Sequence, residues 1–111
     1  MDQNSLRQLA EQGIGNFPPV RLGDLSAWCW DFGEVTGDAR FCSLSRALSV
    51  IVDLFDLHSE QVPSVLVEQL DVLLKQSISG ILHAETAEHG SFLSRQLRKA
   101  VVCAIHNYRA I

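Results

Sequence analysis

The sequence predicts an all-α fold, a single small helical bundle of three long amphipathic helices preceded by one or two short N-terminal helices. After residue 38, apolar side chains recur at spacings of three and four, the period of a helix with one buried face. No two segments share the strict alternation that paired strands need. Of the 111 residues 47% are hydrophobic, enough for one compact core. We expect one domain over residues 1–111, with a loop-rich part (1–38) and a three-helix core (39–111).

The first predicted helix is short and spans residues 5–12, with Ser5 as its N-cap and Gly13 as its stop. Residues 14–23 follow and contain two consecutive prolines. Proline fixes φ and has no amide donor, so we expect an extended connector there.

Residues 24–38 fit two interpretations. Trp28 and Phe32 share a face if the segment is helical, whereas Trp28, Trp30 and Phe32 alternate with other residues as in a strand. We favour a short helix because no partner strand with matching alternation occurs elsewhere. A loop over residues 33–38, bracketed by glycines, is then expected to end it.

Three longer helices follow, expected over residues 39–57, from 63 or 64 to 81, and over 85–109. The first has so narrow a polar strip that it should lie centrally, with neighbours on more than one side. Gly90 falls inside the last pattern, so that helix either kinks there or begins at Ser91.

Charge is spread unevenly along the chain. Nine Lys and Arg residues against thirteen Asp and Glu residues give a net charge of -4. This acidic balance disfavours a general nucleic-acid binder, which needs basic excess to meet phosphates. Residues 91–111 instead carry four bases and no acid, and these bases are expected to share one face of the last helix: Arg95, Arg98, Lys99 and Arg109. This is a candidate anion-binding face; the alternative is a solvated face that complements the helix dipole.

Aromatic and acidic residues cluster before residue 39. In a helix Trp30 is rotated by about 200° from Trp28, so the two cannot face the same core. A partly exposed tryptophan among carboxylates is typical of an anchor for a partner protein. The candidate partner-binding residues are Trp30, Asp31, Glu34 and Asp38. The alternative is that both tryptophans cap the bundle from a loop.

One cluster resembles a metal-binding pattern, His83, Glu85, Glu88 and His89. Glu85 and His89 are four apart and could meet on one helical face. No second motif supplies further ligands, and a polar helix N-terminus explains the same residues. We therefore expect no metal and no cofactor.

No catalytic motif is present. Cys103 and His106 lie three apart, but no third residue is placed to orient them. The glycines at 13 and 15 lack the rest of a phosphate loop, and no Gly-x-Ser-x-Gly or His-Glu-x-x-His occurs. The sequence thus predicts a protein that is not an enzyme and has no catalytic residues.

The three cysteines have no metal-type spacing. No basic lead with an apolar stretch begins the chain, so no secretory signal is expected. Reduced, mostly buried thiols in a cytoplasmic protein are the simplest interpretation. No run approaches the roughly 18 apolar residues of a membrane span, so no membrane partner is expected.

The preferred functional hypothesis is a small acidic protein that binds another protein. A concrete version is an inhibitor, antitoxin or immunity-type protein that masks a basic partner such as a nuclease. The alternative is a regulatory DNA-associated protein that uses the basic face of the last helix, although nucleic acid is a disfavoured partner. Homodimerisation through Leu57, Val65 and Val72 competes with both.

Overall fold

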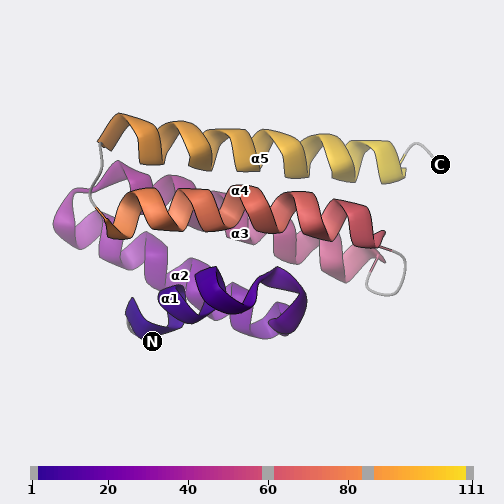
Figure 1. Cartoon of the computed structure of the whole chain (residues 1–111), viewed down its shortest axis with the longest axis horizontal. Coiled ribbons are helices and arrows are strands. Elements are labelled where there is room, and N and C mark those ends of the chain that lie inside the picture. Colours follow the sequence, from indigo (N-terminus) through magenta and orange to yellow (C-terminus); the bar gives the residue numbers. More distant parts are fainter. Residues whose placement is uncertain (1–2, 59–61, 84–86, 110–111) are drawn as a thin grey trace.

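The computed structural model describes residues 3–58, 62–83 and 87–109, and all of their regular structure is helical (Figure 1). This confirms the predicted all-α bundle. The elements are α1 (Gln3–Gln12), the 3-10 turn η1 (Ile14–Asn16), α2 (Pro19–Thr36), α3 (Ala39–His58), α4 (Ser64–Leu82) and α5 (Ala87–Arg109).

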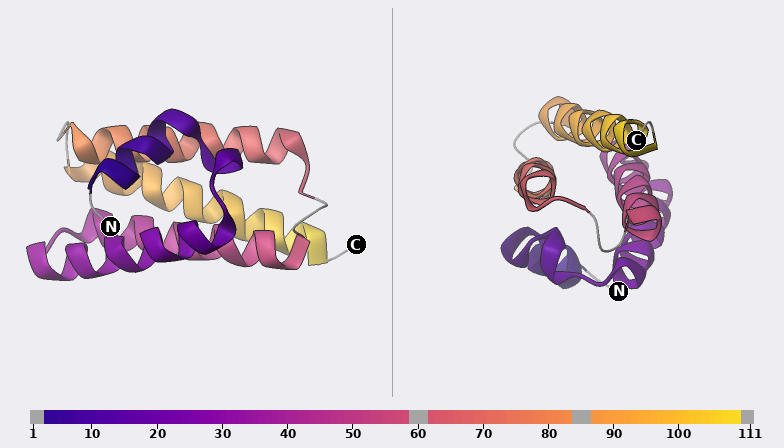
Figure 2. Two further views of the ribbon diagram at one scale, coloured as in Figure 1. Left: turned by 90° about the horizontal axis from the view of Figure 1, so that it is seen from below. Right: turned by 90° about the vertical axis from the view of Figure 1, so that its right-hand side faces the viewer.

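The helices pack pairwise around one core. α2 lies along α3, α4 lies along α5, and α5 also contacts α3. α1 and η1 pack on α4, and the end-on view of Figure 2 shows α1 and α4 on one side, α2 and α3 on the other, and α5 across both. α3 contacts α2, α4 and α5, in agreement with its narrow polar strip. The core also draws on residues before 39, including Leu6, Leu9, Leu22 and Leu25.

α2 is the largest departure from the sequence prediction. The chain is helical from Pro19 to Thr36, so the connector expected up to residue 23 and the loop expected from residue 33 are both wrong. Pro18 is the N-cap in an extended conformation, and Pro19 occupies the first turn, where its missing N–H removes no helical hydrogen bond. The two prolines therefore start this helix.

Two glycines near the end of α2 have different roles. Gly37 is the C-cap, with a left-handed φ of 74° that glycine adopts at little cost. Gly33 lies inside the helix and is buried where α2 meets α3. A Cβ at Gly33 would lie 2.7 Å from Cys42 Sγ and 3.0 Å from the Asp38 carbonyl oxygen. The absence of a side chain thus permits the close approach of the two helices.

The N-terminal segment is attached to α4 by a hydrogen bond from a backbone amide to a side-chain carboxylate. α1 ends at Gln12 as predicted but begins at Gln3, before the expected cap. Gly13 then turns the chain with a φ of 89°, and the amide of Ile14 donates to the Asp71 carboxylate on α4. This bond fixes η1 against α4.

The three C-terminal helices have bounds close to those predicted. α5 is helical from Ala87 onward, so the alternative that it begins at Ser91 is wrong. None of the described helices combines the length and the hydropathy that crossing a membrane requires.

Candidate functional site

A groove of about 560 Å³ lies between α2, α3 and α5. Its principal side chains are Ser26, Trp30 and Asp31 from α2, Arg46 and Ser49 from α3, and Arg98 from α5. Trp30 and Asp31 come from the predicted partner-binding set, whereas Arg98 comes from the predicted anion-binding face. The fold therefore brings parts of two separately predicted surfaces into one groove.

Trp30 forms a wall of this groove. It is half-buried, and the guanidinium carbon of Arg46 lies 5.5 Å from the centre of its ring, a cation–π contact. Trp28 instead stacks on Phe32 with ring centroids 5.1 Å apart and meets Phe41 edge-on. The two tryptophans thus lie on different sides of α2, and the alternative that both cap the bundle from a loop is wrong because both are helical.

Serine hydroxyls join α2 to α3 beneath the groove. Ser26 Oγ donates to the Ser45 carbonyl at 2.7 Å, and Ser45 Oγ donates to the Ser26 carbonyl at 2.6 Å. Ser49 Oγ lies 2.7 Å from Ser26 Oγ. These bonds hold the two helices in one register, and Arg46, which follows Ser45, thereby lies over Trp30. This network was not predicted from the sequence, where it is marked by no more than small polar residues within two helical segments.

The predicted acidic contact residues have different surroundings. Asp31 is exposed and lines the groove. Glu34 is also exposed, one helical turn beyond Trp30 and Asp31. Asp38 lies at the junction of α2 and α3 and does not line the groove.

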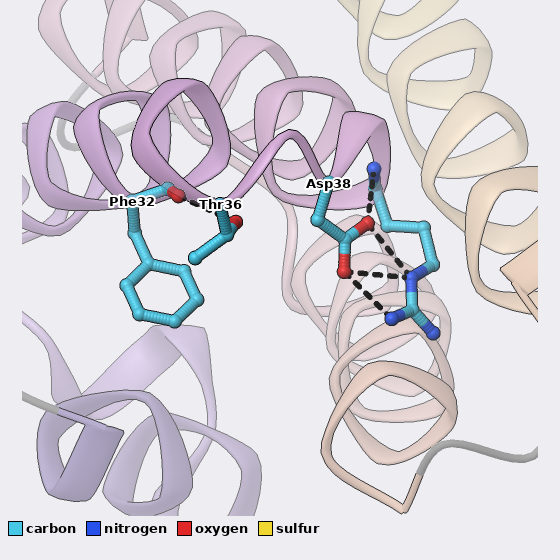
Figure 3. Close-up of polar contacts among 4 residues, drawn as sticks. Phe32, Thr36 and Asp38 are labelled. Atoms are coloured by element: carbon cyan, nitrogen blue, oxygen red, sulfur yellow. Dashed lines mark hydrogen bonds and ion pairs between the residues drawn. The ribbon is translucent and has the colours of Figure 1, made fainter.

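Asp38 caps α3 and pairs with Arg40 (Figure 3). The Arg40 amide donates to Asp38 Oδ1 at 3.0 Å, and the guanidinium of Arg40 contacts both carboxylate oxygens, with Nη2 2.6 Å from Oδ2. The hydrogen bond from the Arg40 side chain lowers the pKa of Asp38. The carboxylate is thus committed to the helix junction and does not take part in the groove.

We predict that Asp38→Ala lowers the free energy of unfolding by about 1 kcal/mol, because it removes both the cap and the ion pair. Asp38→Asn keeps a cap acceptor and loses only the ion pair. Since folding lowers the Asp38 pKa, its ionic contribution is present above the ordinary carboxyl pKa and is lost as the pH falls through the folded value. Urea unfolding at a series of pH values should therefore show the gap between wild type and Asp38→Asn closing towards acid. A gap that does not vary with pH would contradict this role.

The basic face of α5 is exposed at Arg95, Arg98 and Lys99. These residues surround a depression of about 430 Å³ together with Val102 and Cys103. In the described part of the chain no carboxylate forms an ion pair with any of the three cations. The side chain of Arg109 lies outside the described residues.

The cysteines differ in exposure. Cys29 is buried, and burial raises its pKa to about 12, which suppresses the reactive thiolate. Cys42 is half-buried, whereas Cys103 is exposed, contrary to the expectation of burial. His106 is also exposed.

The predicted metal-like cluster lies partly outside the described residues. His83 is the exposed C-cap of α4. Glu85 and the side chains of Glu88 and His89 lie outside the described residues. Among the side chains that the structure does describe, no group of three His, Cys, Asp or Glu residues could hold a metal ion.

Apolar side chains are exposed along one face of α4. Val65 is 63% exposed and Val72 is 55% exposed, two turns apart on the same side. The side chain of Leu57, the third residue of the predicted dimer surface, lies outside the described residues. Homodimerisation stays a prediction.

The α2–α3–α5 groove is the candidate site that the geometry favours. It combines a half-buried aromatic ring, two guanidinium groups and serine hydroxyls on three rigid helices. No protein-family model, no curated protein and no solved structure matches this chain.

Proposed function

We propose that this chain is a non-enzymatic protein-binding domain whose contact surface is the α2–α3–α5 groove. The proposal rests on the position of Trp30, whose ring lies half-buried in the groove wall beneath the guanidinium of Arg46. Tryptophan and arginine are the residues that most often dominate protein interfaces, and they do so in sites where partner contact excludes the remaining water. A ring already fixed by its neighbours loses little conformational entropy on binding.

The exposed sides of α2 and α3 favour a basic partner. Their described residues include five exposed carboxylates and two exposed arginines, namely Asp24, Asp31, Glu34, Asp53 and Asp56 with Arg21 and Arg46. An acidic surface accelerates the encounter with a positively charged partner. It also offers that partner negative charges in place of the polyanion that the partner would otherwise bind. The proposed class is therefore an inhibitor, antitoxin or immunity-type protein that masks a basic partner such as a nuclease. Three free thiols suit the reducing cytoplasm, where we place it.

Trp30→Ala tests the proposal in an affinity capture from the native cell extract. We expect wild type to retain a basic protein that added salt releases, and Trp30→Ala to weaken that binding by at least about tenfold, as for a typical hot spot. Val35→Ala is the matched control, because Val35 is 86% exposed on the same helix and does not line the groove. It should bind as wild type does.

Two results would contradict the proposal. One is equal capture by wild type and Trp30→Ala, with a melting temperature lowered by several degrees in the variant, since Trp30 would then serve stability alone. The other is an association rate that does not change with ionic strength, which would remove the electrostatic part.

The second candidate function is DNA association through the basic face of α5. It is favoured by Arg95, Arg98 and Lys99, three exposed cations without ion-pair partners among the described residues. An electrophoretic shift at low salt that is lost in Arg95→Glu and Lys99→Glu would support it. Absence of any shift would exclude it, because non-specific phosphate binding is strongest at low salt.

A further inference from the structure

Two arginines in the groove have no anionic partner of their own. Arg46 comes from α3 and Arg98 from α5, and no hydrogen bond or ion pair joins the guanidinium of either one to another described residue. Asp31 also lines the groove, but no ion pair links it to either guanidinium. A chain with an excess of carboxylates thus leaves two guanidinium groups free in the same groove.

Arg46 is held in place without using its donors. Its guanidinium carbon lies 5.5 Å from the centre of the Trp30 ring, and a cation–π contact consumes none of the five N–H groups. A guanidinium that is already positioned loses less side-chain entropy when it forms a bidentate bond to an anion. Arg46 is therefore preorganised as a donor.

Ser49 does not add a donor to these two cations. Ser26 Oγ donates its only proton to the Ser45 carbonyl at 2.7 Å, so Ser49 is the donor in its 2.7 Å contact with Ser26 Oγ. The hydroxyl proton of Ser49 is thus committed to Ser26, although Ser49 lines the groove.

We propose that Arg46 and Arg98 form a binding site for the dianion of a phosphate monoester, with Trp30 as the adjacent wall. The guanidinium groups of the two arginines match a ligand group with nearly two negative charges and three acceptor oxygens. The groove of about 560 Å³ is larger than a phosphoryl group and leaves room for the attached organic part beside the ring. The site does not depend on the protein-binding function proposed above.

Fluorescence of Trp30 provides a direct test. The chain has two tryptophans, and Trp28→Phe leaves Trp30 as the only one while keeping an aromatic ring against Phe32 and Phe41. Titration with N-acetylphosphoserine amide and with adenosine monophosphate should give a saturable change, and acetate should give none at the same concentrations. The indole NH signal of Trp30 in the NMR spectrum of the wild type provides the same readout without any substitution.

Neighbouring residues on α5 provide a matched control. We expect Arg46→Gln and Arg98→Gln each to weaken the binding of both phosphate esters at least about tenfold. Arg95→Gln should change it less than about twofold, because Arg95 is exposed on the same helix but does not line the groove. Circular dichroism verifies the fold of each variant, and Arg98, being exposed, can be changed without altering the core.

The pH dependence tests the need for a dianion. Binding of the esters should weaken as the pH falls through about 6, where the second phosphate proton returns. Inorganic sulfate remains a dianion over this pH range, so its binding should not weaken as the pH falls. Stronger binding of the phosphoserine compound indicates that the natural ligand is a phosphorylated protein side chain. Stronger binding of the nucleotide indicates that it is a free phosphorylated metabolite. Either result supports the site.

No saturable change up to millimolar ester would overturn the proposal, as would equal losses in Arg95→Gln and Arg98→Gln. Asp31→Asn separates this proposal from the protein-binding function. Removal of that carboxylate should strengthen binding of the phosphate esters and weaken binding of a basic protein partner, because the two ligands have opposite charge.

Discussion

Gly33→Ala is expected to lower the free energy of unfolding by about 1–3 kcal/mol, the usual range for overpacking a filled interior. The new methyl group would lie 2.7 Å from Cys42 Sγ and 3.0 Å from the Cys42 amide nitrogen. Two of its three nearest neighbours are backbone atoms, which cannot rotate away. α2 must therefore move from α3, which also lengthens the serine hydrogen bonds under the groove. Urea-induced unfolding measures the change.

Gly23 provides a control on the same helix. An added Cβ there would meet nothing within 4 Å, so Gly23→Ala gains helix propensity without a clash. We expect it to raise the free energy of unfolding by up to about 1 kcal/mol. If Gly23→Ala and Gly33→Ala change the free energy of unfolding in the same direction, the close packing of α2 on α3 is contradicted.

Gly13→Ala is expected to be at least as costly, because two effects act together. The φ of 89° and ψ of 165° at Gly13 are strained for any residue with a side chain, which costs about 1–3 kcal/mol. The added Cβ would also lie 2.9 Å from Cγ of Asp71. In the double variant with Asp71→Ala, the crowding is removed but the backbone strain remains. The loss in free energy of unfolding of the double variant should therefore differ from the sum of the losses in the two single variants.

Gly15 is the matched control for this turn. Its φ is not positive, and an added Cβ would lie 3.6 Å from Val67, an ordinary contact distance. Thermal unfolding of Gly15→Ala should resemble that of wild type within about 0.5 kcal/mol, the usual range for a tolerated surface change. Equal stability of Gly13→Ala and Gly15→Ala would contradict both the strain at Gly13 and the crowding of its added Cβ by Asp71.

Periodicity predicted α3 and α4 to within one or two residues because large apolar side chains recur at helical spacing on their buried sides, among them Leu44, Leu48, Leu70 and Leu74. The same reasoning failed for α2. Its buried positions include Ser26, Cys29 and Gly33, small or polar residues that carry little apolar signal. The burial of Ser26 is possible only because α3 supplies partners for its hydroxyl, and no local pattern shows this.

The candidate site was predictable to a similar extent. Trp30 and Asp31 were found from sequence because an aromatic residue among carboxylates is a local signal. Arg46 could not be found, since its place over Trp30 depends on the register of α2 on α3. Asp38 had a local signal that was missed: an aspartate directly before a helix is a typical N-cap.

The central claim is that α2 continues as one helix to Thr36 and holds Trp30 against Arg46 on α3. A NOESY spectrum of the isotope-labelled protein tests it most directly. The account predicts helical carbon shifts from residue 19 to 36 and cross peaks between the indole protons of Trp30 and the side-chain methylene protons of Arg46. Non-helical shifts after Phe32, together with an indole ring that shows no cross peak to Arg46, would contradict it.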